Sequence, residues 1–279
     1  MEKIPINRLI DFSPVDGTGN RFAIFVQKCP FRCLYCHNPE TINECSACGV
    51  CVEACPKGAL KKESGAIIYD ESKCVGCDTC LRVCPNLSSP KTRYMSVEEI
   101  ESRITRVRPF IRGITVSGGE CALYPSFLEE LFIRVKRMGL TCLIDSNGSK
   151  SFKDLEYLVD LCDGVMLDVK AYDDDFHRKL TSKSNAVVIE NLDYLLSKNK
   201  LEEVRTVILP KYDDQNRNTV DNVSRIIGNK SRYKLIRYRY YGVREEGLKE
   251  FGKVIVDESY AQALAELARK NGCVDVVIS

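Results

Sequence analysis

Three cysteines within eight residues are the side chains of this sequence most suited to chemistry. Cys29, Cys33 and Cys36 stand at CxxxCxxC spacing, directly after an apolar run, 22–26, that predicts a buried strand. Three thiolates can cap three corners of an iron–sulfur cube and leave one iron without a protein ligand, open to a small molecule. A structural zinc ion needs four ligands, and His37 cannot easily be the fourth because it directly follows Cys36. The spacing therefore favours an iron–sulfur cluster with an open iron.

The composition indicates a metal or redox role in a reducing compartment. The chain has 279 residues, 15 cysteines and a formal net charge of +2. This balance of charge gives no electrostatic argument for nucleic acid or an anionic membrane as a partner. No apolar run approaches the roughly 20 residues that a membrane span needs, and the first residues lack the apolar core of a secretory signal. We therefore expect a cytoplasmic protein, and the odd cysteine count argues against disulfides.

A second cysteine pattern occurs twice, shortly after the first motif. Each copy reads CxxCxxCxxxCP, and the two copies contain Cys45, Cys48, Cys51 and Cys55, then Cys74, Cys77, Cys80 and Cys84. This is the run of bacterial two-cluster ferredoxins, in which the fourth cysteine of each run binds the other run's cluster. The expected ligand sets are Cys45, Cys48 and Cys51 with Cys84, and Cys74, Cys77 and Cys80 with Cys55. Zinc ribbons also use CxxC pairs, but two complete copies favour ferredoxin-type clusters.

The two copies predict an inserted domain at residues 41–92. Such a small domain has little apolar core, so the clusters themselves would hold it together. The remaining residues, 1–40 and 93–279, would then form one main domain. The insert could supply electrons or serve only as a docking platform.

From Ser96 onward, predicted helices and strands alternate. A capping box, Ser96 to Glu99, opens one helix, and a second begins at Pro125 and ends before Gly139. Further helices are expected around 155–162, 188–196, 223–227 and 264–268. The expected strands are 113–116, 140–144, 164–169, 204–209 and 235–239, with the final run, 274–278, as one more. About six strand–helix units indicate a parallel sheet, curled into a full or partial barrel or left open.

Residues that could bind a ligand follow these predicted strands. In parallel α/β folds, the reacting groups lie at the carboxyl ends of the strands. The residues at these ends are Ser117-Gly118-Gly119-Glu120, Asp145-Ser146-Asn147-Gly148, Asp168, Lys170, Arg205 and Arg239. A glycine-containing loop at 11–21 precedes the predicted strand 22–26. Its glycines would allow another backbone to approach closely, but an ordinary surface turn would explain the loop equally well.

Together these motifs resemble the radical S-adenosylmethionine (SAM) enzymes that activate glycyl-radical enzymes. The resemblance rests on the CxxxCxxC loop, on Ser-Gly-Gly-Glu at 117–120 and on Asp-Gly-Thr-Gly-Asn-Arg at 16–21. Cys36-His37-Asn38-Pro39, the paired ferredoxin motifs and 145–148 are most similar to the YjjW-type activases. The implied fold is α/β, a partial (β/α)6 radical SAM barrel with a small inserted bacterial-type 2×(4Fe-4S) ferredoxin domain.

The resemblance also implies cofactors and site residues. Cys29, Cys33 and Cys36 would hold a catalytic 4Fe-4S cluster that binds S-adenosylmethionine, which makes three 4Fe-4S clusters in all. The residues expected around S-adenosylmethionine are Tyr35 near the adenine, Gly118, Gly119 and Glu120 at the methionine end, and Asp145, Ser146, Asp168, Lys170, Arg205 and Arg239. Positions that surround a monovalent cation in related activases are matched by Asp145, Ser146, Met166 and Asp168. The partner's peptide is expected to contact Asp16, Gly17 and Arg21. Ser146, where Thr is usual, and Arg239, where His is frequent, depart from the family pattern.

The implied activity is that of a radical SAM oxidoreductase. It would reductively cleave S-adenosylmethionine to methionine and a 5′-deoxyadenosyl radical, which takes a hydrogen from a glycine of a partner enzyme. The expected partners are the glycine loop of a glycyl-radical enzyme and a flavodoxin- or ferredoxin-type reductant. Two alternatives stay open: a radical SAM enzyme that acts on a small molecule, and a non-catalytic iron–sulfur electron carrier. Outside these motifs, we expect His177 on the surface and buried free thiols at Cys121, Cys142, Cys162 and Cys273.

Overall fold

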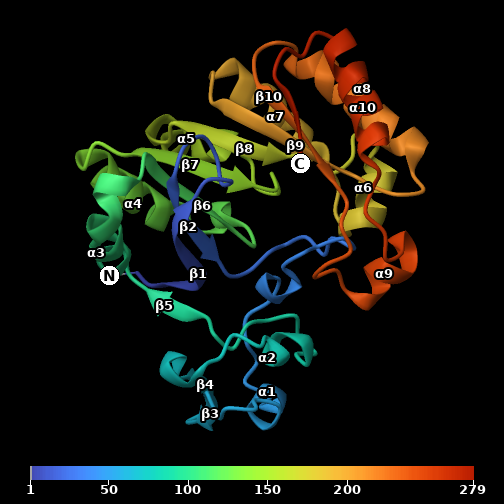
Figure 1. Ribbon diagram of the computed structural model, residues 1–279. Helices are drawn as coiled ribbons and strands as arrows, with labels where there is room; N and C mark the ends of the chain where they lie inside the picture. The colour runs from blue at the N-terminus through green and yellow to red at the C-terminus, as the bar shows by residue number, and fades with distance from the viewer. Residues whose placement is uncertain (1) are drawn as a thin grey trace.

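Seven parallel strands form the centre of the fold, as the alternation predicts. The computed structural model describes residues 2–279 and contains a nine-stranded sheet (Figure 1). In spatial order its strands are β11 (Val276–Ile278), β10 (Arg232–Arg237), β9 (Leu201–Ile208), β8 (Gly164–Asp168), β7 (Thr141–Ser146), β6 (Gly113–Gly118), β2 (Arg21–Val26), β1 (Ile4–Ser13) and β5 (Arg93–Met95). Strands β2 and β6 to β11 are parallel, whereas β1 pairs antiparallel with both β2 and β5. The sheet curves but does not close, because β11 and β5 remain as its edges.

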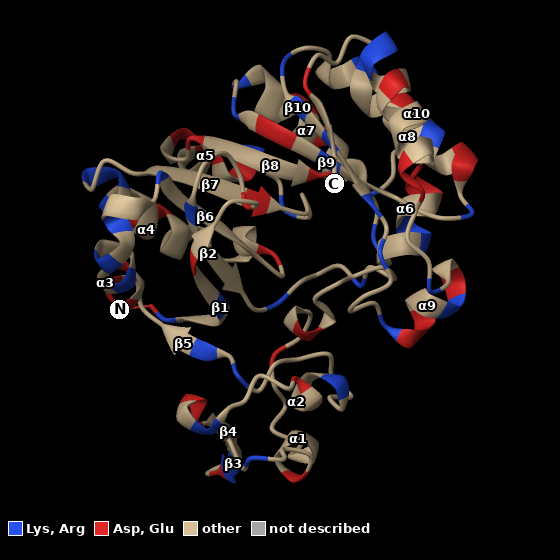
Figure 2. Ribbon diagram, viewed as in Figure 1, with Lys and Arg blue, Asp and Glu red and all other residues tan. Residues whose placement is uncertain are grey.

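Amphipathic helices cover the outer face of this sheet. The α-helices that follow residue 92 are α3 (Val97–Val107), α4 (Pro125–Arg137), α5 (Glu156–Leu161), α6 (Asp174–Thr181), α7 (Ala186–Ser197), α8 (Asp213–Ile227), α9 (Glu245–Phe251) and α10 (Glu258–Lys270). The predicted capping box is present at α3, where Ser96 Oγ accepts the Glu99 N–H and the Glu99 carboxylate accepts the Ser96 N–H. Figure 1 shows α3 and α4 outside one end of the sheet and α8 and α10 outside the other. Lys and Arg are mixed with Asp and Glu over these helices (Figure 2).

Strand alternation decides which side chains reach the inner face of the curved sheet. Successive side chains point to opposite faces, and directly paired residues share a face. Asp145 on β7 is paired with Met166 on β8, and Met166 with Glu203 on β9. These three side chains therefore form a row across the inner face, while Cys142 and Ile144 of β7 are buried toward the helices.

A small substructure follows β2 and precedes β5 in the sequence, and it lies apart from the main sheet (Figure 1). It contains α1 (Val50–Glu53), α2 (Thr79–Arg82) and a two-stranded antiparallel sheet of β3 (Leu60–Glu63) and β4 (Ala66–Tyr69). Its apolar cluster is separate from the main core and has only Cys51, Leu60 and Cys80 as buried members. Two of these three residues are cysteines, so ordinary side-chain packing contributes little to this part of the chain.

The first strand and two short helices were not foreseen. The predicted loop at 11–21 begins only after Ser13, because β1 continues to that residue and pairs with β2. Helices α6 and α9 follow the fourth and sixth strands of the parallel set. The prediction that His177 lies on the surface is wrong: on α6 its ring is completely buried and meets Phe31 edge to face at 5.4 Å. No helix among residues 2–279 combines the length and the apolar character of a membrane span.

Candidate functional site

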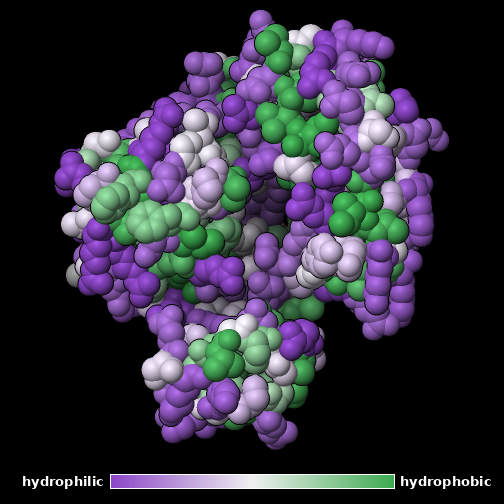
Figure 3. Space-filling view, viewed as in Figure 1, coloured by the Kyte–Doolittle hydropathy of each residue, from purple (hydrophilic) through white to green (hydrophobic). Residues whose placement is uncertain are grey.

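The loop Cys29–Cys36, called the cysteine loop below, leaves the carboxyl end of β2 and is held by backbone hydrogen bonds. The N–H groups of Arg32 and Leu34 each donate, at 2.9 Å, to carbonyls at the end of α6, those of Thr181 and Leu180. The Cys29 N–H donates to Ile42 O at 3.0 Å. The loop therefore lies across the carboxyl ends of the parallel strands, at the edge of the hollow that Figure 3 shows in the centre of this face.

Helix α9 and the residues before it pack directly on the cysteine loop. A Cβ atom added at Gly247 would lie 1.9 Å from Leu34 O, so only glycine permits this contact. Gly242 has a φ of +79°, and a Cβ there would lie 2.6 Å from His37 O. Arg244 Nη2 donates to the carbonyls of Arg32 and Cys33, each at 3.3 Å. A segment more than 200 residues away in sequence thus sets the position of the loop.

The three thiols of the loop are shielded from solvent. Cys33 is buried, and Cys29 and Cys36 are half-buried. Burial, reinforced by the neighbouring Cys36 and opposed by Lys170, raises the pKa of Cys33 to about 12, and burial likewise raises the pKa of Cys29 and Cys36. A bound metal centre favours the thiolate form of such thiols, because a cysteine must lose its proton to ligate a metal. The donor set, three sulfurs on eight residues, fits a cube with one iron left open. Among residues 2–279, no three His, Cys, Asp or Glu side chains are arranged to hold a single metal ion.

Gly118 and Gly119 allow the carboxyl end of β6 to pack against the residues just before the cysteine loop. Gly118 has a φ of +118°, and its added Cβ would lie 2.2 Å from Val26 N. An added Cβ on Gly119 would lie 2.0 Å from Lys28 O. Because side chains are absent here, Gly119 N–H donates to Val26 O and Glu120 N–H donates to Lys28 O.

Glu120 is completely buried and joins the loops that follow β6 and β7. Its Oε1 accepts hydrogen bonds from Ser146 Oγ and Ala122 N–H, both at 2.9 Å, and its Oε2 accepts the Asn147 N–H at 2.8 Å. Burial raises the pKa of Glu120 to about 7, although these three donors lower it. The carboxylate therefore holds the loops after β6 and β7 together. Cys121, next to it, is a buried thiol whose Sγ lies 3.5 Å from Asp145 O.

Arg205 connects the acidic side chains of the inner face. Its Nη1 lies 3.0 Å from Asp145 Oδ2, its Nε 2.5 Å from Glu203 Oε1 and its Nη2 3.0 Å from Met166 Sδ. Ser117 Oγ also donates to Asp145 Oδ2 at 2.9 Å. Burial alone would lower the pKa of Arg205, but the carboxylates of Asp145 and Glu203 raise it. The guanidinium stays charged and sits between β7, β8 and β9.

A second ion pair lies nearer the cysteine loop. Lys170 Nζ donates to Asp168 Oδ2 at 2.9 Å and stands 5.8 Å from the centre of the Tyr35 ring. Tyr35 is buried against Phe251 of α9, and its hydroxyl has no hydrogen-bond partner in the part of the chain that the structure describes. The structure thus brings the cysteine loop, Asp145, Asp168, Lys170 and Arg205 to one side of the curved sheet.

Comparison with known proteins identifies the family. Residues 23–223 match the Radical SAM superfamily. The chain belongs to the radical SAM superfamily. A Haemophilus influenzae protein described as a glycyl-radical enzyme activating enzyme is 30% identical, over 96% of this chain and 94% of its own length. The indoleacetate decarboxylase activating enzyme of Tractidigestivibacter scatoligenes is 32% identical over 76% of this chain and 75% of its own, and the pyruvate formate-lyase 1-activating enzyme of Escherichia coli is 27% identical over 82% and 78%.

A solved structure supports the fold of this radical SAM protein. QueE from Escherichia coli superposes with a TM-score of 0.55 at 14% identity, over 99% of this chain and 94% of that one. The α/β fold with a parallel sheet is therefore confirmed.

The glycine-containing loop before β2 is anchored by a buried arginine. Arg21 is 1% exposed, and its guanidinium donates to Ile114 O at 2.6 Å, Thr141 O at 3.1 Å, Thr18 O at 3.2 Å and Thr115 Oγ1 at 2.8 Å. Burial lowers its pKa to about 10. A Cβ added at Gly17 would lie 2.6 Å from Leu143 Cδ1, so the loop reaches the inner face of the sheet. Asp16 and Gly17 are half-buried, whereas Arg21 holds the loop from within the protein.

Arg239 lies outside this constellation. Strand β10 ends at Arg237, and Arg239 is exposed; its carbonyl accepts a hydrogen bond from His37 Nε2 at 2.8 Å. The sequence placed Asn147 at the end of the third strand without a specific role, and its Nδ2 lies 3.3 Å from Cys29 Sγ. The only sequence signal for it was its place in the loop after β7.

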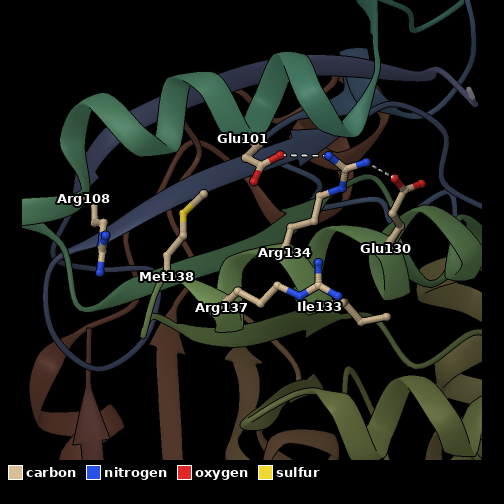
Figure 4. Close-up of a pocket in the computed structure, with 7 residues that line it drawn as sticks. All are labelled: Glu101, Arg108, Glu130, Ile133, Arg134, Arg137 and Met138. Atoms are coloured by element: carbon tan, nitrogen blue, oxygen red, sulfur yellow. Dashed lines mark hydrogen bonds and ion pairs between the residues drawn. The ribbon is translucent and has the colours of Figure 1, made fainter.

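A pocket between α3 and α4 has no part in this site. Figure 4 shows that it is lined by Glu101, Arg108, Glu130, Ile133, Arg134, Arg137 and Met138, on the outer face of the sheet. Arg134 donates to both Glu101 and Glu130, so its charge is already paired. The chemistry of the molecule is concentrated at the cysteine loop instead.

Proposed function

We propose that this radical SAM protein activates a glycyl-radical enzyme. The observation that carries the proposal is the cysteine loop, which holds one buried and two half-buried thiols on the same side of the sheet as Asp168 and Lys170. The names of three relatives, each an activating enzyme, point to the same activity. When bound, the 4Fe-4S cluster and S-adenosylmethionine supply one-electron cleavage of a carbon–sulfur bond, giving methionine and a 5′-deoxyadenosyl radical that takes a hydrogen atom from a glycine.

The rim residues supply the contacts that S-adenosylmethionine needs. Lys170 and Arg205 are fixed cations for its carboxylate, and Tyr35 offers a buried ring for its adenine. Gly118 and Gly119 expose backbone beside the cysteine loop for its methionine end. Glu120 and Ser146 act through position, since they bond to each other and to Asn147. Arg239, which is exposed, belongs to the set only if β10 and its loop rearrange on binding.

The residues expected to bind a monovalent cation already contact basic side chains. Its expected ligands include Asp145, Met166 and Asp168, together with Ser146. Arg205 contacts both Asp145 Oδ2 and Met166 Sδ, and Lys170 contacts Asp168. A monovalent ion would therefore compete with the Arg205 guanidinium for Asp145 Oδ2 and Met166 Sδ.

We further propose that residues 41–92 form a two-cluster ferredoxin domain within the main domain, 1–40 and 93–279. A cavity of the insert is lined by Cys55, Cys74, Cys77 and Cys80, which is one of the two expected ligand sets. Cys45, Cys48, Cys51 and Cys84 would form the other. Together with the cysteine loop this makes three 4Fe-4S clusters.

A hydrogen-bonded bridge joins the insert to the cysteine loop and supports an electron-supply role. Asn43 Nδ2 donates to Asn86 O at 2.7 Å, and the Asn43 N–H donates to Leu87 O at 3.1 Å. The preceding residue, Ile42, accepts the Cys29 N–H. Asn43 is two residues from Cys45, and Asn86 is two from Cys84, so the set containing these cysteines lies nearest the cysteine loop along the chain. An external flavodoxin- or ferredoxin-type protein would be the reductant.

The partner's glycine loop would meet Asp16 and Gly17 at the inner face, with Arg21 as their internal support. A cytoplasmic location, without nucleic acid or membrane as a partner, agrees with the formal net charge of +2.

The test uses the anaerobically reconstituted full chain, reduced flavodoxin, S-adenosylmethionine and a candidate glycyl-radical enzyme. We expect a glycyl-radical EPR signal in the partner and one 5′-deoxyadenosine for each radical. Cys33→Ala should abolish both while the insert keeps its clusters, and Cys162→Ala, a buried thiol far from the loop, should abolish neither. Cleavage with a small molecule consumed, and no radical in any partner, would support the alternative enzyme; reduction without cleavage would support an electron carrier.

A further inference from the structure

Asn147 presents its side-chain amide to a sulfur of the cysteine loop. Its Nδ2 lies 3.3 Å from Cys29 Sγ, although the two residues are 118 positions apart in sequence. Asn147 is 7% exposed, so water does not compete effectively for this donor. Neither the strand pattern nor the cysteine spacing requires such a contact.

The orientation of the amide follows from its neighbours. Asn147 Oδ1 accepts the Ser149 N–H at 2.9 Å, so this end must be the oxygen and the end facing Cys29 must be the NH2 group. The Asn147 backbone N–H donates to Glu120 Oε2 at 2.8 Å. Glu120 is itself buried and fixed by Ser146 and Ala122. The amide is therefore held rigidly toward the sulfur before any cofactor binds.

We propose that Asn147 tunes the reduction potential of the cluster on the cysteine loop by donating a hydrogen bond to the Cys29 thiolate. The inference rests on the proposed function, which places a 4Fe-4S cluster on that thiolate. Reduction adds a negative charge that spreads onto the ligand sulfurs, so an N–H donor stabilises the reduced form more than the oxidised form. Asn147 thus makes this cluster easier to reduce.

A purely structural role for Asn147 makes different predictions. The loop 147–152 is already fixed from the other side by Asn191, whose Nδ2 donates to Gly148 O and Lys150 O and whose Oδ1 accepts the Phe152 N–H. The turn itself needs only Asn147 Oδ1 and the backbone. A substitution that keeps the oxygen and removes the N–H therefore separates tuning from support.

The experiment is EPR-monitored redox titration of the full, reconstituted chain. The signal of the cysteine-loop cluster is identified as the one that Cys33→Ala removes. Asn147→Asp keeps the acceptor for Ser149 but replaces the donor with a carboxylate beside the thiolate. Asn147→Ala removes both groups, and Asn191→Ala loosens the same loop without touching the sulfur.

Tuning predicts that the midpoint potential shifts to more negative values in Asn147→Ala and further in Asn147→Asp, while Asn191→Ala keeps that of the unmodified protein. An unchanged midpoint in Asn147→Asp, or equal shifts in Asn147→Ala and Asn191→Ala, would overturn the inference and leave the proposed function intact. If no signal of the unmodified protein is lost in Cys33→Ala, the cluster assignment fails, and the inference fails with it.

Discussion

Arg205 Nη1 lies 3.0 Å from Asp145 Oδ2, across a strand that separates the two residues in the sheet. The intervening strand, β8, places Met166 Sδ under the same guanidinium at 3.0 Å. This relationship fixes the charge pattern of the inner face. Under the proposed function, it would also orient the Arg205 cation for S-adenosylmethionine.

We predict that Arg205→Gln weakens both folding and cofactor binding. Asp145 would remain buried without a cationic partner and Glu203 would keep only the longer pair with Arg232 at 3.8 Å, which costs roughly 3–5 kcal/mol of unfolding free energy. Arg205→Lys should have a smaller effect, because it keeps the charge but not the three-way contact. Anaerobic thermal unfolding and equilibrium binding of S-adenosylmethionine measure the two effects.

Arg225→Gln is the matched control, since Arg225 forms only an exposed pair with Asp221 one helical turn away. It should change neither quantity measurably. If the Arg205→Gln and Arg225→Gln variants had the same unfolding free energy, the inner ion pairs would not stabilise the fold.

We predict that Arg21→Met loosens the loop before β2. The substitution leaves the carbonyls of Ile114 and Thr141 without their donor, which should lower the unfolding free energy by about 2–4 kcal/mol. Hydrogen exchange should rise most at 14–20, where Arg21 supports the loop through Thr18 O. If Arg21 instead contacted the partner directly, the variant would lose glycyl-radical formation while exchange in this loop stayed unchanged.

Local patterns were sufficient for the repeating part of the fold. A few residues are enough to predict both the strand at 113–118, from its apolar run, and the helix that begins after Ser96, from its capping box. The thiol ligands were equally visible, because three cysteines within eight residues share one loop.

Other features depend on which distant loops meet, and no local pattern encodes that. The placement of Asn147 beside Cys29 and the burial of His177 against Phe31 both arise where the cysteine loop meets distant segments, the loop after β7 and helix α6. Glu120 was expected at the ligand because of the resemblance to the activases, yet its oxygens bond to the neighbouring loop. Its direction is decided by tertiary packing.

We predict that Gly247→Ala selectively disturbs the cysteine loop. The new methyl group would overlap Leu34 O, so α9 has to move away from the loop, at a cost of roughly 1–3 kcal/mol. The EPR signal that Cys33→Ala removes should weaken more than the signals of the insert. Lys249→Ala, at an exposed position of the same helix, is the control and should leave all signals unchanged. Equal loss of all signals in Gly247→Ala would mean that α9 supports the whole fold and not this loop.

We predict that Asn43→Ala slows electron transfer from the insert to the cysteine loop. The substitution removes the hydrogen bond to Asn86 O and the one that Asn43 Oδ1 accepts from Arg32 of the cysteine loop, while the backbone bonds of Asn43 to Leu87 and of Ile42 to Cys29 remain. The path between Cys84 and Cys29 then loses its side-chain contacts at Asn43 without separation of the two parts of the chain. Stopped-flow reduction by flavodoxin should show the cluster on the cysteine loop filling several-fold more slowly, with unchanged reduction of the insert.

Two comparisons make this last result decisive. Asn222→Ala, on the exposed side of α8, should leave both phases unchanged, because its amide bonds only to Asn218 O within the helix. Cys74→Ala removes a ligand from the set that lies farther along the path. If electrons enter through that distal set, reduction of the cluster on the cysteine loop should also be slower in Cys74→Ala. If flavodoxin reduces the cysteine-loop cluster directly, neither Asn43→Ala nor Cys74→Ala should alter its rate, and the insert would then be a docking platform.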